Sequence, residues 1–133
     1  MSNIDWDKAA HVFALIPQVI AAWGFGSAHS GRMHAASDLD MGVLFAAHPT
    51  LDTLADLRVA LQQALQFDKI DLVVLNNASP VVRFEAVCGR LIFCRNAGQR
   101  AAFVSLTARE YEESMAMIQR ALAARAMHGS GAV

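Results

Sequence analysis

The sequence has little excess charge of either sign. Its 133 residues include 11 Lys and Arg against 12 Asp and Glu, which gives a formal net charge of −1. Proteins that bind nucleic acid or anionic membranes through their charge carry a clear basic excess. The charge balance therefore argues against a nucleic-acid substrate and against attachment to an anionic membrane surface.

Long apolar runs are also missing. No stretch approaches the roughly 20 predominantly apolar residues that a membrane-spanning helix requires. A secretory leader begins with a basic region followed by an apolar one, and residues 1–7 do not show this pattern. We therefore expect a cytoplasmic protein that makes no contact with a membrane.

Cysteine is scarce, and Cys88 and Cys94 are the two in the chain. Their spacing fits neither a zinc knuckle nor a disulfide framework. Reduced cysteines are the rule in the cytoplasm, and cysteine is often buried. We expect both side chains to be reduced and to lie in the core.

What the sequence does have is a large apolar fraction, 55% of its residues, without internal repeats or linkers. A chain of this length forms one domain with a real core, but it is small for an enzyme that carries its own substrate-binding lobe. We expect a single domain over residues 1–128. The small residues near the C-terminus predict a disordered tail over 129–133.

Two aspartates flank one leucine at the start of a predicted strand. Because side chains alternate between two faces of a strand, Asp38 and Asp40 share one face. Two unit charges about 4 Å apart repel by about 4 kcal/mol at an effective dielectric constant near 20. A shared proton, a basic side chain or a divalent cation can offset this repulsion, and the cation is the commonest solution for converging oxygen ligands. The plain alternative is a polar strand end that faces water.

A third acid, Asp71, lies in the predicted strand 69–75. Three carboxylates on neighbouring strands could hold two metal ions roughly 3.5–4 Å apart, an arrangement used in phosphoryl and nucleotidyl transfer. In that role Asp71 would be the third ligand and a candidate base for the attacking hydroxyl. Its alternative role is an ordinary acid at a strand edge.

A Gly-Ser pair ends the first predicted strand. Gly26 lets the backbone approach a ligand closely, and Ser27 offers a hydroxyl where a helix is predicted to begin. Free N–H groups at such a helix start attract phosphate. Ser27 therefore suits a helix cap alone, or a helix cap that also contacts a phosphate.

These residues together carry a resemblance. Gly26 and Ser27, ten intervening residues, the Asp38-x-Asp40 pair and the later strand acid Asp71 resemble the DNA polymerase beta-like nucleotidyltransferase superfamily. More narrowly, the chain resembles the minimal nucleotidyltransferase (MNT, MntA-like) antitoxins of HEPN–MNT toxin–antitoxin systems. A Gly-Ser pair alone would carry no such information.

The similarity extends to residues 76–85 and 89–93, so it covers most of the chain. One segment departs from the family pattern. These families often carry Ala-Arg-Gly just after the Gly-Ser pair, whereas this sequence has His29-Ser30-Gly31 and its nearest arginine is Arg32. Arg32 is therefore the candidate substitute for a phosphate-binding arginine.

The resemblance implies an Mg²⁺-dependent nucleotidyltransferase that transfers AMP from ATP and releases pyrophosphate. The implied acceptor is a tyrosine of a cognate HEPN-domain ribonuclease toxin, which the protein neutralises within a hetero-oligomer. The implied catalytic and metal-binding residues, with two Mg²⁺ ions, are Asp38, Asp40 and Asp71, and the implied nucleotide-binding residues are Gly26, Ser27 and Arg32.

Two other functions stay open from the sequence. The altered segment after Ser27 allows a non-catalytic antitoxin that neutralises its toxin by complex formation, and a Met-rich apolar face in the C-terminal helical segment is suited to docking a partner. Nucleotidyl transfer to a small molecule is the third possibility. The short chain argues against it, because no acceptor-binding domain is evident.

The predicted fold is α+β and nucleotidyltransferase-like. A small mixed β-sheet carries helices on one face and the acidic site on the other, and a helical segment follows at the C-terminus. Leu51, Leu54, Leu61 and Leu65 are spaced to pack one helix on the sheet. The predicted strands are 19–25, 39–45, 69–75 and 91–94, and the predicted helices are 5–15, 27–33, 51–66, 80–88 and 96–127. The last of these is either one helix or two helices broken near 105–107.

Overall fold

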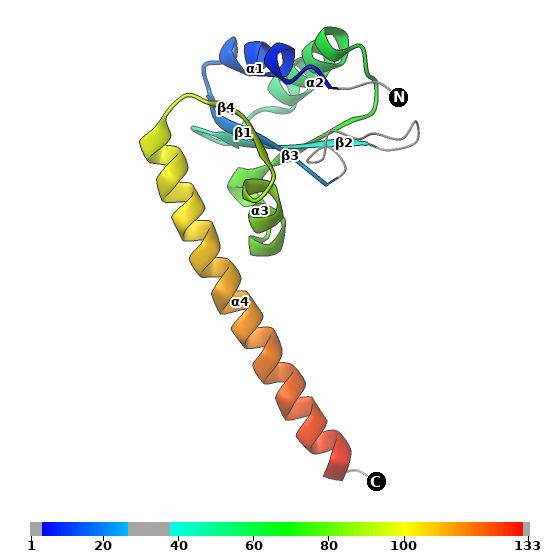
Figure 1. Cartoon of the computed structure of the whole chain (residues 1–133), viewed down its shortest axis with the longest axis vertical. Coiled ribbons are helices and arrows are strands. Elements are labelled where there is room, and N and C mark those ends of the chain that lie inside the picture. The colour runs from blue at the N-terminus through cyan, green and yellow to red at the C-terminus, as the bar shows by residue number, and fades with distance from the viewer. Residues whose placement is uncertain (1–3, 27–37, 132–133) are drawn as a thin grey trace.

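A computed structural model of the chain describes residues 4–26 and 38–131 (Figure 1). The helix predicted over 27–33 lies outside these residues. In chain order the elements are α1 (Trp6–Ala14), β1 (Val19–Phe25), β2 (Leu39–Phe45), α2 (Leu51–Leu65), β3 (Ile70–Val74), the 3-10 turn η2 (Leu75–Asn77), α3 (Pro80–Val87), β4 (Arg90–Cys94) and α4 (Ala97–Gly131).

One mixed sheet organises the described chain, with the strand order β3-β2-β1-β4. Strand β1 pairs antiparallel with both β2 and β4, and β2 pairs parallel with β3. Parallel neighbours need a crossover connection, which α2 provides between β2 and β3. The predicted α+β class with a small mixed sheet is confirmed, and β4 lies at an edge as expected.

Helices cover both faces of the sheet (Figure 1). On one face, α1 and α2 enclose a core that includes Phe13, Val43 and Leu57. On the other face, α3 and the first half of α4 close a second cluster around Trp23 and Leu75. Helices α1 and α2 form the layer that was expected opposite the acidic site. Helices α3 and α4 form a second layer, on the same face as that site.

Short polar side chains fix where the helices begin. The Asp5 carboxylate accepts from the Lys8 N–H at 3.2 Å, and the Thr50 hydroxyl accepts from the Thr53 N–H at 3.1 Å. Ser79 caps α3, whose first residue is a proline. These caps satisfy N–H groups that have no partner within the helix, so they set the helix starts that the sequence predicts.

Arg95 links the end of α1 to the start of β1 through hydrogen bonds. Its Nε donates to the Val19 carbonyl at 2.9 Å, and its Nη2 donates to the Ala14 and Ile16 carbonyls at 3.0 Å each. The last carbonyls of a helix lack partners within that helix. One guanidinium therefore satisfies the end of α1 and fixes the turn into β1.

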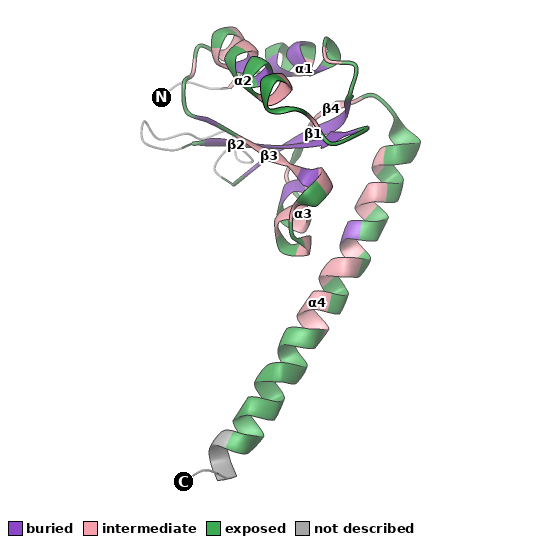
Figure 2. Ribbon diagram, turned by 180° about the vertical axis from the view of Figure 1, so that it is seen from behind, coloured by how far each residue is buried: buried purple, intermediate pink, exposed green. Residues whose placement is uncertain are grey.

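Helix α4 is one continuous helix of 35 residues, about 52 Å long at 1.5 Å per residue. Its later part extends away from the sheet, and every residue from 117 to 128 is exposed (Figure 2). It runs to Gly131 and so includes the first residues of the segment 129–133, where a tail is predicted. Within the described chain, no helix combines the length and apolar character needed to cross a membrane.

Two sequence expectations about burial are wrong. Cys88 is exposed, although both cysteines are free thiols as predicted, because it caps the end of α3 and projects beside a pocket. Leu51 is 84% exposed because it is the first residue of α2 and lies beyond the packed turns. Leu57 and Leu61 are the residues that α2 buries fully.

Candidate active site

The structure brings the three predicted acids together at one end of the sheet. Asp40 on β2 pairs in register with Asp71 on the parallel strand β3. Side chains at paired positions of neighbouring strands point to the same face and lie side by side. Asp38 precedes Asp40 by two residues and interacts electrostatically with it.

The cluster changes the protonation of its central member. Burial raises the pKa of Asp40, and the neighbouring charges of Asp71 and Asp38 raise it further. Each effect disfavours the ionised carboxylate. The end of the sheet therefore concentrates negative charge, which is the setting in which a divalent cation binds favourably.

The raised pKa predicts how Asp40→Asn changes stability with pH. An acid whose pKa is raised on folding stabilises the folded state through its bound proton. This contribution is complete below the unfolded-state pKa and is lost as the pH rises through the folded-state pKa. We therefore expect Asp40→Asn to be more stable than the wild type at pH 7 without nucleotide or metal, and this advantage to vanish near pH 3. Urea unfolding with EDTA at both pH values measures the difference.

Asp68→Asn is the matched control for this experiment, because Asp68 is exposed and precedes β3 outside the cluster. Its substitution should leave stability nearly unchanged at both pH values. An Asp40→Asn protein that is less stable than the wild type at pH 7 would contradict the electrostatic account of the cluster.

Gly26 lies directly against the carboxylate of Asp40. Its φ of 62° is in the left-handed region, and an added Cβ would lie 2.8 Å from the Asp40 Oδ2 atom. Only glycine meets both conditions without strain. The predicted nucleotide-binding turn thus contacts the acidic cluster, whereas Ser27 and Arg32 lie outside the described residues and their roles stay predictions.

The donor set suits a hard cation. Paired carboxylates from Asp40 and Asp71 offer oxygen ligands of the kind that Mg²⁺ prefers. Across residues 4–26 and 38–131, no group of three His, Cys, Asp or Glu side chains is arranged to hold a metal ion. Mg²⁺ typically takes one or two protein carboxylates and completes its shell with substrate phosphates and water. The residues therefore fit a cation that binds together with a nucleotide.

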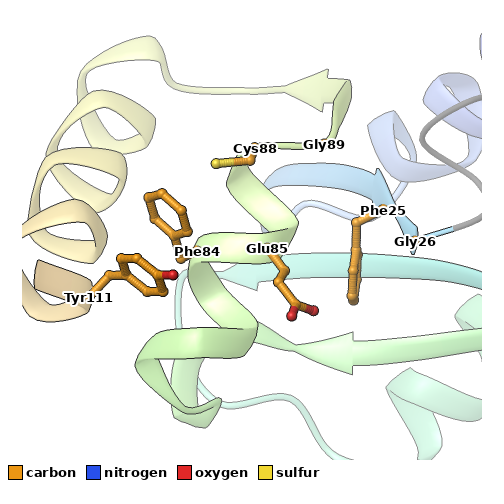
Figure 3. Close-up of a pocket in the computed structure, with 7 residues that line it drawn as sticks. All are labelled: Phe25, Gly26, Phe84, Glu85, Cys88, Gly89 and Tyr111. Atoms are coloured by element: carbon orange, nitrogen blue, oxygen red, sulfur yellow. The ribbon is translucent and has the colours of Figure 1, made fainter. Parts of the chain in front are cut away.

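A pocket of about 460 Å³ opens beside the acidic cluster (Figure 3). Phe25 links the two, because it lines the pocket and pairs with Asp40 across strands β1 and β2. No local sequence pattern indicates this pocket, because its walls come from segments that are distant in the chain. The residues that line it are Phe25, Gly26, Phe84, Glu85, Cys88, Gly89 and Tyr111.

A mixed sheet with a glycine turn against paired carboxylates defines a nucleotidyltransferase-like fold. A family model described as "Polymerase beta, Nucleotidyltransferase" matches residues 7–98, a span that includes the turn and all three acids. The chain belongs to the polymerase beta nucleotidyltransferase family. A search among curated proteins gave no match.

Solved structures extend the likeness to almost the whole chain. A crystal structure of a toxin–antitoxin with AMP-PNP contains a chain that is 25% identical, with a TM-score of 0.75 over 93% of this chain and 99% of that chain. A mutant of the toxin–antitoxin MntA-HpeT contains one that is 27% identical, also with a TM-score of 0.75, over 93% and 98% of the two chains.

A third neighbour is the structure of a tri-AMPylated HEPN toxin from Shewanella oneidensis in complex with an MNT antitoxin. It is 23% identical, with a TM-score of 0.66 over 90% of this chain and 96% of that chain. At that identity the likeness concerns the fold. Together these neighbours confirm the predicted resemblance to MNT antitoxins.

Proposed function

We propose that this protein is a cytoplasmic antitoxin that transfers AMP from ATP to a tyrosine of a cognate HEPN-domain ribonuclease toxin. The observation that carries the proposal is the in-register pairing of Asp40 with Asp71 beside the Gly26 turn. Family membership supports nucleotidyl transfer. The AMP-PNP complex and the tri-AMPylated toxin of two fold neighbours support ATP as donor and AMP as the transferred group.

In the proposed reaction, the acceptor hydroxyl oxygen forms a bond to the α-phosphorus of ATP while the bond to pyrophosphate breaks. Once ATP is bound, Asp38, Asp40 and Asp71 together with the ATP phosphates would hold two Mg²⁺ ions, which would neutralise the phosphate charge. In the proposal Asp71 also accepts the proton that leaves the tyrosine hydroxyl. The proposal is tested by label transfer from α-³²P-ATP to the partner, as set out in the Discussion.

Close approach of the triphosphate depends on the turn after β1. Gly26 leaves space beside the Asp40 carboxylate that any side chain would fill. In the proposal Ser27 contacts a phosphate through its hydroxyl and backbone N–H, and Arg32 contacts a phosphate through its guanidinium. These contacts would align the α-phosphorus with the acceptor.

We place the docking surface for the toxin on the exposed half of α4. Ile118 and Leu122 are 48% and 57% exposed and continue the apolar stripe that packs on α3 through Tyr111. Fold neighbours crystallised as two-protein toxin–antitoxin complexes, and their similarity covers 93% of this chain. The toxin is therefore the occupant that we propose for this surface.

Ile118→Glu combined with Leu122→Glu should weaken binding of the purified HEPN partner by about 30-fold or more, because charged side chains would replace apolar contacts at the interface centre. Calorimetric titration measures the affinity. Ala124→Glu with Met127→Glu is the control, because these exposed residues lie on the opposite side of the same helix. Equal affinity for both double variants would exclude the proposed surface.

A second candidate function is neutralisation by binding alone. The replacement of the usual Ala-Arg-Gly by His29-Ser30-Gly31 favours it, and so does the large exposed face of α4. The test is a double variant that combines Asp38→Ala with Asp40→Ala. Full neutralisation of the toxin by this variant at equimolar dose would support binding alone over catalysis.

A further inference from the structure

The pocket beside the acidic cluster lies between three separate elements. Phe25 comes from β1, Glu85 from α3 and Tyr111 from α4. Its volume of about 460 Å³ is within the usual range of about 300–1,000 Å³ for pockets that bind small organic molecules. Gly26 belongs both to this pocket and to the turn against the Asp40 carboxylate. A molecule bound at the turn can therefore extend directly into the pocket.

Aromatic side chains form much of the pocket wall. Phe84 and Tyr111 stack with ring centroids 3.9 Å apart and an interplanar angle of 10°, which holds both rings in fixed positions. Phe25, at 8% exposure, is fixed in the second core cluster. Such rigid aromatic surfaces suit a flat ring with apolar faces.

Glu85 adds one strong hydrogen-bond acceptor to these apolar walls. It is exposed, and Figure 3 shows its carboxylate between the Phe25 ring and the Phe84–Tyr111 pair. An ionised carboxylate accepts hydrogen bonds and donates none. The pocket therefore suits a flat aromatic ring whose edge carries an N–H donor.

We infer that this pocket binds the adenine ring of ATP and that Glu85 accepts a hydrogen bond from its exocyclic amino group. The inference rests on the proposed nucleotidyl transfer and adds a base-recognition subsite to it. The ring fills the space between Phe25 and the stacked pair, and the phosphates extend past Gly26 to the acidic cluster. Glu85 is thus a specificity-determining residue for the base.

The position of the pocket favours the base over the acceptor side chain. In phosphoryl transfer the attacking oxygen approaches roughly in line with the leaving group, from the opposite side of the phosphorus. The pyrophosphate binds at the Gly26 turn in the proposed reaction, so the acceptor must approach from the side away from that turn. The pocket borders the turn itself, where the donor nucleotide lies.

The test compares ATP with purine riboside triphosphate, which lacks the amino group. Calorimetry with Mg²⁺ measures binding of each nucleotide to the full chain, so the readout does not depend on transfer to a partner. The wild type should bind ATP about tenfold or more tightly than the analogue, because a site built to hydrogen-bond a group rejects a ligand that lacks it. Glu85→Met, which keeps a similar length but has no carboxylate, should bind both nucleotides equally.

Glu113→Met is the control, since Glu113 is an exposed glutamate of α4 that does not line the pocket. It should retain the wild-type preference for ATP. Equal affinity of the wild type for both nucleotides, or an unchanged preference in Glu85→Met, would overturn the base subsite and leave the proposed function standing. A wild type that binds neither nucleotide would overturn both. If Glu85→Met weakens only toxin binding, the pocket holds the acceptor and the inference is wrong.

Discussion

Replacing Asp40 with asparagine should reduce transfer of label from α-³²P-ATP to the HEPN partner by about 100- to 1,000-fold or more. The change removes one negative charge from the site proposed to hold the metal ions, and stabilisation of charge in the transition state contributes effects of that size. The side chain keeps its shape, and loss of the like-charge repulsion should preserve the fold. Gel autoradiography of the purified pair measures the transfer.

Asp38→Asn should show a similar loss, because Asp38 belongs to the same cluster. Asp68→Asn, an exposed aspartate before β3, should transfer label at the wild-type rate. Circular dichroism spectra establish that each variant is folded. Retained labelling by both cluster variants would exclude the assignment of these carboxylates to catalysis.

Gly89→Ala should destabilise the protein by about 3 kcal/mol or more, the largest effect on folding that we expect from one methyl group. An added Cβ would overlap the carbonyl oxygen of Gly24 on β1 and would lie 3.1 Å from the Ala86 carbonyl oxygen. Both neighbours are backbone atoms, so relief requires movement of β1 or α3, and overpacking of this kind is costly. Urea unfolding measures the change.

Gly98→Ala provides the comparison for this variant. Its Cβ would lie 3.4 Å from the Asn96 Oδ1 atom, an ordinary contact in the first turn of α4. Alanine favours a helix more than glycine by up to about 1 kcal/mol, so this variant should be as stable as the wild type or more so. If Gly89→Ala is as stable as the wild type, the close approach of Gly89 to β1 does not occur as described.

The strands that flank the site were predictable to the residue. Residues 19–25 and 39–45 are apolar runs, and local signals mark the end of β1, at the Gly-Ser pair, and the start of β2, just after Asp38. The predicted helix starts at residues 51 and 80 were equally local, since Thr50 and Ser79 cap α2 and α3. Elements whose limits depend on nearby residues can be predicted from the sequence.

Features that depend on distant contacts were not predictable in this way. Arg95 bonds to the Val19 carbonyl across 76 positions of the chain, and no local pattern indicates that contact. The pocket joins Phe25, Glu85 and Tyr111 from three elements. The pairing of Asp71 with Asp40 also depends on strand register, so from the sequence Asp71 was a candidate third ligand with an ordinary strand-edge acid as the alternative.

Intact-mass spectrometry of the HEPN-domain partner, after incubation with this protein, ATP and Mg²⁺, tests the central claim most directly. The account predicts that the partner gains the mass of one or more AMP groups, that peptide mapping places them on tyrosine, and that EDTA or Asp40→Asn prevents the gain. A partner that keeps its unmodified mass, while the wild-type protein still neutralises it, would contradict the account.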